Sequence, residues 1–261
     1  MNKIADAFNG KKALIAYLMA GDPNLEKSAE YILTAQEAGA DLIEIGIPFS
    51  DPIAEGKVIQ EASVRALNAG ARLDGIFEMV ASLKDKIRVP LVFMTYLNPV
   101  FVYGYERFFH TCKELGVGGI IIPDLPWEEQ EEVKLPASKY GVAVIPLVAP
   151  TSSKRIERIV KDAEGFIYLV SSMGVTGVRN EITSNIRDRV SELKKATSLP
   201  VAVGFGISSP KQAGEYAQWT DGVIVGSAIV NMIAEHGENA HYALGKYISE
   251  LKASVSGKDT F

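Results

Sequence analysis

Eight short apolar segments recur along the chain, and each is followed by a segment with helical periodicity. Each apolar segment spans five to eight residues, the length typical of a strand buried on both faces of a parallel sheet. The predicted strands are Ala13–Ala20, Asp41–Ile47, Pro90–Tyr96, Gly118–Ile122, Ala143–Val148, Gly165–Val170, Pro200–Gly204 and Asp221–Val225. This alternation predicts parallel strands joined by right-handed helical crossovers.

The helical segments carry glycine at their ends and Asp, Asn or Ser at their starts. They are predicted at Leu25–Ala38, Val58–Ala69, Asp74–Lys86, Tyr105–Leu115, Glu128–Tyr140, Ser153–Ala163, Ile186–Thr197, Pro210–Gln218 and from Ile229 to Val255, with a short amphipathic helix in residues 1–8.

Eight strand–helix units can form a closed barrel or an open doubly wound sheet. No GxGxxG motif follows the first strand and no GxxxxGK[ST] motif occurs, so nucleotide-binding open sheets lose their main support. The count of eight, together with a length of 261 residues, favours a (β/α)8 TIM barrel with short extra helices. Because no linker or low-complexity tract is found, we expect a single domain over residues 1–261.

The composition excludes several classes of partner. The net charge is −5 and the basic residues are scattered, so a nucleic-acid surface is not expected. No apolar run reaches the roughly 18 residues that span a membrane, and the N-terminal segment does not resemble a signal peptide. The only cysteine is Cys112, which fits a reducing compartment. We therefore expect a cytoplasmic protein.

Chemistry in such a barrel belongs at the carboxyl ends of the strands. Read in order, these ends are Gly21-Asp22, Glu44 to Pro48, Tyr96-Leu97-Asn98-Pro99, Pro123-Asp124, Ala149-Pro150-Thr151, Ser171-Ser172, Gly204-Phe205-Gly206 and Gly226-Ser227. No lysine is among them, so a Schiff base has no obvious nucleophile. The three histidines fall in predicted helices, so no metal site is expected. Carboxylates, hydroxyls and backbone amides remain.

The segment from Glu44 to Gly56 contains the most informative carboxylates. Glu44 lies inside a predicted buried strand, and Asp51 and Glu55 follow in a loop punctuated by proline and glycine. This pattern indicates a general acid/base site, although an acid at a strand end that simply pairs with a nearby Lys or Arg accounts for it equally well.

Glycine-bearing loops follow the last three strands. Gly204 to Ser208 and Gly226-Ser227 occupy the places where TIM barrels commonly bind phosphate, and Met173 to Gly177 forms a third such loop. Glycine lets backbone amides approach an anion closely. These loops predict a phosphorylated substrate, against the alternative that the glycines only form tight turns.

Five segments, in this order, resemble the tryptophan synthase alpha chain family and cover nearly the whole chain. They are Met19-Ala20-Gly21-Asp22-Pro23, Glu44-Ile45-Gly46-Ile47-Pro48-Phe49-Ser50-Asp51-Pro52, Gly174-Val175-Thr176-Gly177, Gly204-Phe205-Gly206-Ile207-Ser208 and Val225-Gly226-Ser227-Ala228-Ile229-Val230.

The resemblance implies a lyase of tryptophan biosynthesis that cleaves indole-3-glycerol phosphate to indole and glyceraldehyde 3-phosphate. It implies that Glu44 is the acid/base residue and that Glu55 is the second carboxylate, which engages the indole N–H. The family usually has aspartate in an Ala-Asp-Gly-Pro run, whereas this chain has Ala54-Glu55-Gly56-Lys57, and Ala16 replaces a frequent proline.

The same resemblance implies the substrate-binding residues. Gly177, Gly206, Gly226 and Ser227 match phosphate-binding positions, and Thr176 matches the residue that bonds the second carboxylate. The indole pocket is expected to be lined by Tyr17, Tyr96, Tyr168, Phe205, Met94 and Ile121; Met94 and Ile121 fit ordinary barrel core equally well. Asp124 is expected to couple to the loop around Asp51 or to cap a turn.

The family acts as an α2β2 complex with a beta chain that carries pyridoxal phosphate, so the resemblance implies that partner and no cofactor in this chain. The segments Ser50-Asp51-Pro52 and Asn98-Pro99-Val100-Phe101 match the partner-contacting loops. Two alternatives stay open. One is a catalytically weakened subunit that binds and regulates a beta chain, and the other is a stand-alone lyase that releases indole.

Overall fold

The computed structural model describes residues 3–149, 155–171, 179–204 and 206–257, with the side chains of 179–185 left out. Within these residues, parallel strands form one sheet in the order β5-β4-β3-β2-β1-β9-β8-β7-β6. The strands are β1 (Ala13–Met19), β2 (Leu42–Gly46), β3 (Leu91–Met94), β4 (Val117–Ile121), β5 (Ala143–Val144), β6 (Leu147–Val148), β7 (Ile167–Val170), β8 (Val201–Gly204) and β9 (Gly222–Val225).

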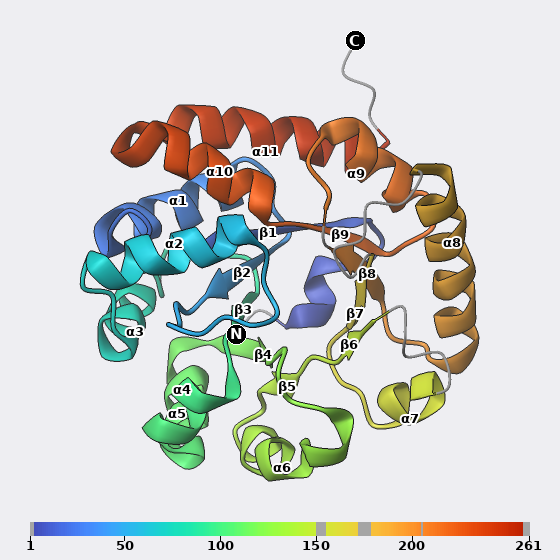
Figure 1. The fold of residues 1–261 in the computed structure, drawn as a ribbon, viewed down its shortest axis with the longest axis horizontal. Helices are drawn as coiled ribbons and strands as arrows, with labels where there is room; N and C mark the ends of the chain where they lie inside the picture. The colour runs from blue at the N-terminus through green and yellow to red at the C-terminus, as the bar shows by residue number, and fades with distance from the viewer. Residues whose placement is uncertain (1–2, 150–154, 172–178, 205, 258–261) are drawn as a thin grey trace.

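The sheet curls into a ring, seen end-on in Figure 1. Its two outermost strands, β5 and β6, are consecutive in the chain and together occupy the predicted strand Ala143–Val148. They are separate because Pro146 has no N–H to donate. The Ile145 amide donates to Ile120 on one side, at 2.8 Å, and the Tyr168 amide donates to the Pro146 carbonyl on the other, at 3.0 Å. The predicted (β/α)8 barrel is therefore confirmed.

Helices surround the ring (Figure 1). They are α1 (Leu25–Glu37), α2 (Lys57–Asn68), α3 (Leu73–Ser82), α4 (Leu97–Tyr103), α5 (Tyr105–Leu115), α6 (Glu131–Lys139), α7 (Ile156–Lys161), α8 (Arg179–Ala196), α9 (Pro210–Ala217), α10 (Ser227–His236) and α11 (His241–Val255), with the 3-10 turns η1 (Ile4–Ala7), η2 (Trp127–Glu129) and η4 (Gly237–Asn239).

Helix α4 is the main element that the sequence analysis did not predict. The resemblance implied a partner-contacting loop at Asn98-Pro99, but Pro99 occupies the third position of α4, within the first turn, where backbone N–H groups have no partner in the helix and proline is tolerated. The predicted C-terminal helical region divides into α10 and α11 around Gly237, whose φ of +53° suits glycine.

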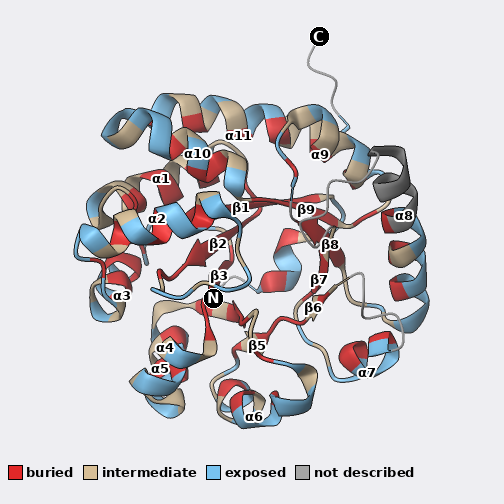
Figure 2. Ribbon diagram, viewed as in Figure 1, coloured by how far each residue is buried: buried red, intermediate tan, exposed pale blue. Residues whose placement is uncertain are grey.

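The strands divide their side chains between two apolar clusters. On β1, Leu14, Ala16 and Leu18 pack outward under the helices, whereas Ile15 and Tyr17 point into the ring. Figure 2 shows the strands as a buried band inside a ring of helices whose outer surfaces are exposed. The period of two in strand geometry fixes this division, and it places Glu44, between the outward Ile43 and Ile45, inside the barrel.

The turn η1 lies within the ring and closes one end of the barrel. Ile4 belongs to the inner cluster, and a Cβ atom added to Gly119 would lie 2.9 Å from its side chain. Phe8 lies next to Gly222 in the same way. The N-terminal segment was predicted as a short amphipathic helix, and its apolar side fills the barrel floor.

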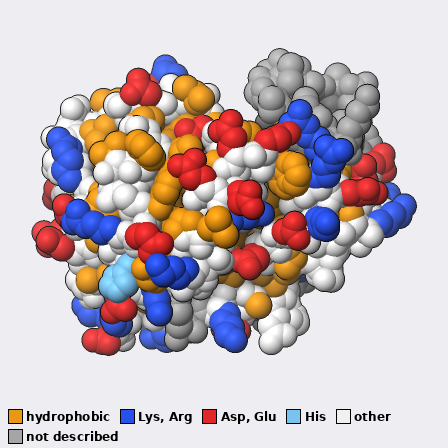
Figure 3. Space-filling model, turned by 90° about the horizontal axis from the view of Figure 1, so that it is seen from below, with side chains coloured by type: hydrophobic (Ala, Val, Ile, Leu, Met, Phe, Trp, Pro, Cys, Tyr) orange, Lys and Arg blue, Asp and Glu red, His pale blue; other side chains and the backbone are white. Residues whose placement is uncertain are grey.

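The surface carries both signs of charge. On the side drawn in Figure 3, Lys and Arg side chains are interspersed with Asp and Glu side chains around apolar patches. No helix within the described ranges is long and apolar enough to cross a membrane.

Candidate active site

Glu44 is a fully buried carboxylate in the barrel interior. Its residue is 1% exposed, and its Oε2 atom has no hydrogen-bond partner in the described structure. It lies beside Tyr17 of β1 and Val92 of β3 in the strand register. Burial, and secondarily the charge of Glu55, raises the pKa of Glu44 to about 8. At neutral pH this side chain is therefore mainly a proton donor.

Glu55 lies in the loop between β2 and α2 and is half-buried. Burial raises its pKa to about 7. The loop is held from two sides: the Ala54 amide donates to the Tyr96 hydroxyl at 2.9 Å, and the Glu55 carbonyl accepts from the Gln60 side chain at 2.8 Å. Because the Glu55 charge raises the pKa of Glu44, the structure brings the two predicted carboxylates into one electrostatic site.

Two tyrosines line the interior beside these carboxylates. Tyr17 and Tyr168 are 4% and 5% exposed, and the pKa of each is raised by burial and by the charges of both Glu44 and Glu55. Each ring lies over a glycine at a strand end, since a Cβ atom on Gly46 would overlap the Tyr17 hydroxyl and one on Gly204 would overlap the Tyr168 hydroxyl. The two glycines thus make room for the two hydroxyls.

The remaining residues predicted for the apolar pocket have mixed outcomes. Met94 and Ile121 are buried in the inner cluster, a position that suits both a pocket wall and barrel core. Tyr96 is buried and its ring lies 5.4 Å from that of Phe49. Phe205 lies outside the described residues, as do Thr176 and Gly177.

Of the loops predicted to bind phosphate, the structure describes the residues that follow β8 and β9, apart from Phe205. Gly226 is the N-cap of α10 and Ser227 its first residue, and Ser227 is exposed. Gly206 is also exposed and has a φ of +74°, a conformation that favours glycine. The start of a ten-residue helix beside a glycine-bearing turn can bind an anion through backbone amides.

The predicted partner segments lie in two loops. Ser50, Asp51 and Asn98 are exposed, and Pro52 and Pro99 are half-buried. The Ser50 hydroxyl donates to Asp51 at 2.6 Å. Asp124 accepts from the Leu97 amide at 2.9 Å, so it caps the start of α4, the second of the two roles expected for it.

An ion pair with a buried carboxylate and a half-buried guanidinium was missed by the sequence analysis. Arg65 on α2 binds Asp22, which follows β1, through two hydrogen bonds. Asp22 was noted only as a residue at a strand end. Nothing in the sequence signals this partnership, because the two residues are 43 positions apart.

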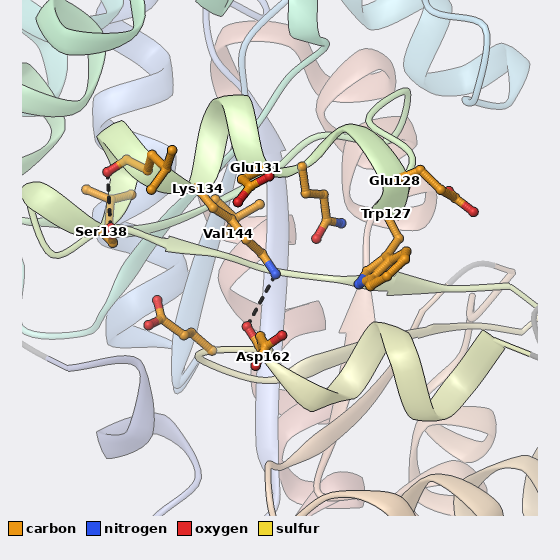
Figure 4. A pocket seen from close by; sticks show the side chains of 11 residues that line it. Trp127, Glu128, Glu131, Lys134, Ser138, Val144 and Asp162 are labelled. Atoms are coloured by element: carbon orange, nitrogen blue, oxygen red, sulfur yellow. Dashed lines mark hydrogen bonds between the residues drawn. The ribbon is translucent and has the colours of Figure 1, made fainter.

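A cleft of about 440 Å³ lies elsewhere, outside the barrel between α6 and the region of α7 (Figure 4). Trp127, Glu128 and Glu131 line it, and the Lys134 ammonium donates to the Asp162 carbonyl across it. None of the predicted site residues lines this cleft. In the part of the chain that the structure describes, no cluster of three or more His, Cys, Asp or Glu side chains could hold a metal ion.

Comparison with known proteins gives one consistent result. The family profile described as "Tryptophan synthase alpha chain" matches residues 4–256. A relative of that name from Lacticaseibacillus casei is 45% identical over 258 residues, which cover 99% of this chain and 97% of that protein.

Solved structures agree. The tryptophan synthase alpha subunit of Legionella pneumophila str. Paris superposes with a TM-score of 0.90 at 36% identity, covering 98% of this chain and 99% of that one. A chain from the tryptophan synthase a2b2 complex of Pyrococcus furiosus superposes with a TM-score of 0.86 at 39% identity, covering 92% and 98%.

Proposed function

The chain belongs to the tryptophan synthase alpha chain family, and from this premise we propose that Glu44 is the acid/base residue of its reaction. The chain is a carbon–carbon lyase of tryptophan biosynthesis that cleaves indole-3-glycerol phosphate. The observation that carries our assignment is the complete burial of Glu44 inside the barrel, with one carboxylate oxygen unpartnered in the described structure.

The bond that breaks joins C3 of the indole to the hydroxyl-bearing first carbon of the glycerol chain. Protonated Glu44 gives its proton to indole C3, which makes the ring an electron acceptor. The resulting Glu44 carboxylate then takes the proton of the first-carbon hydroxyl. The electrons of that O–H bond form the aldehyde, and those of the C–C bond return to the ring. Indole and glyceraldehyde 3-phosphate are released, and Glu44 ends protonated.

The pKa of Glu44 supports both steps. A pKa of about 8 keeps the group protonated at neutral pH, as the first step requires. The same pKa is close enough to neutral pH for the carboxylate to accept a proton in the second step. A surface glutamate would be ionised and could not serve as the acid.

Glu55 is proposed to accept a hydrogen bond from the indole N–H, which becomes more acidic when C3 is protonated. A carboxylate placed there stabilises the positive charge that develops on the ring. Burial raises its pKa to about 7, so the carboxylate form is accessible near neutral pH.

Gly206, Gly226 and Ser227 are proposed to bind the phosphate group, together with Gly177. Thr176 is proposed to bond Glu55, and Tyr96, Tyr168 and Phe205 to enclose the indole. The exposed Ser227 hydroxyl and the helix start at Gly226 supply donors of the kind that phosphate needs.

We further propose a beta chain as partner, which in an α2β2 assembly would carry pyridoxal phosphate, while this chain requires no cofactor. The Pyrococcus furiosus neighbour comes from an a2b2 complex. Three large apolar side chains lie within or next to the predicted contact segments, which supports docking there: Ile53, Phe101 and Val102 are 81%, 61% and 74% exposed. With Cys112 as its single cysteine, the chain cannot form an internal disulfide, and we propose a cytoplasmic site of action.

Single-turnover cleavage of indole-3-glycerol phosphate, measured with and without a beta chain, tests this proposal. Cleavage that the beta chain stimulates is the expected result. Binding of the beta chain without cleavage would instead identify a weakened regulatory subunit, and fast cleavage that ignores the beta chain would identify a stand-alone indole-releasing lyase.

A further inference from the structure

The Tyr17 hydroxyl is a buried polar group that an apolar indole wall does not explain. The residue is 4% exposed, and its Oη atom has no hydrogen-bond partner among the described residues. A phenylalanine would supply the same apolar surface without burying an unpaired hydroxyl, which is unfavourable. The hydroxyl therefore requires an explanation beyond packing.

The Tyr17 side chain spans the distance between two parts of the proposed site. Strand β1 lies between β2, which carries Glu44, and β9, which leads to Ser227. A Cβ atom added to Gly226 would lie 3.4 Å from the Tyr17 Cβ, whereas one added to Gly46 would overlap the hydroxyl. The ring thus extends from the end of β9 across to the end of β2.

The Tyr17 hydroxyl is also displaced from Glu44 toward the carboxyl end of β2. Gly46 is the next inward-facing position after Glu44 on β2, and Tyr17 Oη lies over it. Tyr17 Oη and Glu44 Oε2 do not bond each other, since neither atom has a hydrogen-bond partner within the described ranges. Each is available to a different oxygen of one ligand.

This placement matches one part of the substrate. A molecule with its phosphate at Gly226-Ser227 and its reacting carbon at Glu44 must lay its glycerol chain across Tyr17. Glu44 takes the proton of the first-carbon hydroxyl, which leaves the hydroxyl of the middle carbon facing Tyr17. Resting on the proposed function, we propose that the Tyr17 hydroxyl hydrogen-bonds the middle-carbon hydroxyl and makes the enzyme select substrates that carry it.

The electrostatic surroundings support a neutral donor. Burial and the charges of Glu55 and Glu44 raise the pKa of Tyr17 well above its ordinary value. The hydroxyl therefore keeps its proton throughout the working pH range and can donate to, or accept from, an alcohol.

The test compares indole-3-glycerol phosphate with its analogue that lacks only the middle-carbon hydroxyl. Both retain the bond to be cleaved, so kcat/KM can be measured for each with the wild-type chain and with Tyr17→Phe. The wild type is expected to prefer the natural substrate by roughly ten- to a hundredfold. Tyr17→Phe is expected to reduce this preference to about threefold or less. An equal preference in both proteins would overturn the inference.

A matched variant and a stability measurement separate this role from a structural one. Tyr96→Phe also removes a pocket hydroxyl, but that hydroxyl already accepts from the Ala54 amide, so the preference is expected to persist whatever its rate. Because the Tyr17 hydroxyl has no partner in the part of the chain that the structure describes, Tyr17→Phe is expected to have a Tm equal to or above that of the wild type. A lower Tm with an unchanged preference would assign the hydroxyl a purely structural role.

Glu44→Gln distinguishes failure of this inference from failure of the proposed function. An inactive Glu44→Gln with an unchanged substrate preference in Tyr17→Phe would overturn only the role of Tyr17. A fully active Glu44→Gln would overturn the acid/base assignment, and the comparison of the two substrates would still report on Tyr17.

Discussion

Arg65 on α2 binds Asp22, which follows β1, through two parallel hydrogen bonds, from Nε at 2.9 Å and from the terminal guanidinium nitrogen at 2.8 Å. The Asp22 side chain is 3% exposed and that of Arg65 36%. Helix α2 begins at Lys57, directly after the Glu55 loop. The pair therefore fixes α2, the helix that follows the Glu55 loop, against the segment that follows β1, the strand that carries Tyr17.

Replacement of Arg65 should weaken both the fold and the site. Arg65→Ala leaves the buried Asp22 carboxylate without its partner, so we expect the free energy of unfolding to fall by roughly 2–4 kcal/mol. Arg65→Lys should retain only part of this stability, because lysine cannot form the bidentate pair of hydrogen bonds that arginine makes with a carboxylate. Urea unfolding measures the change. Lys57→Ala, which removes an exposed ion pair with Glu61 on the same helix, should cost about 0.5 kcal/mol or less. Equal losses of unfolding free energy in the two alanine variants would contradict a stabilising role for the Arg65–Asp22 pair.

Glu44→Gln should nearly abolish turnover while the barrel stays folded. The amide keeps the shape of the side chain but can neither give nor take the proton, so kcat should fall by roughly 10²–10⁴-fold. Indole release from indole-3-glycerol phosphate measures it, with circular dichroism as the control for folding. Cleavage at the unmodified rate would refute the acid/base role.

The stability of the fold should depend on pH through Glu44. Its pKa is raised from 4.5 to about 8 in the folded protein, so the folded state holds a proton that the unfolded state has lost. The burial of Glu44 therefore does not lower the free energy of unfolding below pH 4.5. Between pH 4.5 and about pH 8 it lowers that free energy progressively, by about a few kcal/mol in total. Glu44→Gln should become more stable relative to the wild type as the pH rises from 5.5 to 8.5 in urea titrations. A constant difference would show that the pKa is not raised.

Glu55→Asp should leave turnover equal or increase it. Aspartate is the usual residue of the family. Glutamate places the carboxylate one methylene further from the backbone of a loop that Tyr96 and Gln60 hold in place. Small errors of position are costly for catalysis. Steady-state kcat/KM provides the measurement, and Glu55→Gln, which loses the charge, should be slower than either. A tenfold lower rate for Glu55→Asp would mean that the surrounding loop is fitted to glutamate.

Phe101→Glu should weaken binding to a beta chain without changing the intrinsic reaction. Phe101 is 61% exposed on α4, and a charge at an apolar contact is expected to lower affinity by roughly tenfold or more. Titration of beta-chain binding gives the affinity, and cleavage without the partner gives the control rate. Tyr242→Glu is the matched variant, since Tyr242 is 76% exposed on α11, a helix at the top of the ring in Figure 1, whereas α4 lies at its lower left. Equal losses in both variants would exclude docking at α4.

Local patterns were enough to predict most of the elements. Alternating apolar runs and glycine-terminated helical segments predict the strands within a few residues, because burial and backbone conformation act over neighbouring positions. The two main misses have local causes as well. Pro99 fits inside the first turn of α4, and Pro146 divides one predicted strand into β5 and β6.

The sequence by itself determined that Glu44 is a buried carboxylate, since it lies in an apolar strand between Ile43 and Ile45. Only the tertiary structure decided what surrounds it. Closure of the sheet sets β9 beside β1, with Ala13 paired to Gly222, and so places Tyr17 between the acid and the predicted phosphate loop. It also joins Arg65 to Asp22. Such contacts depend on the geometry of the closed barrel, which no short stretch of sequence encodes, because the partners meet only when distant segments pack together.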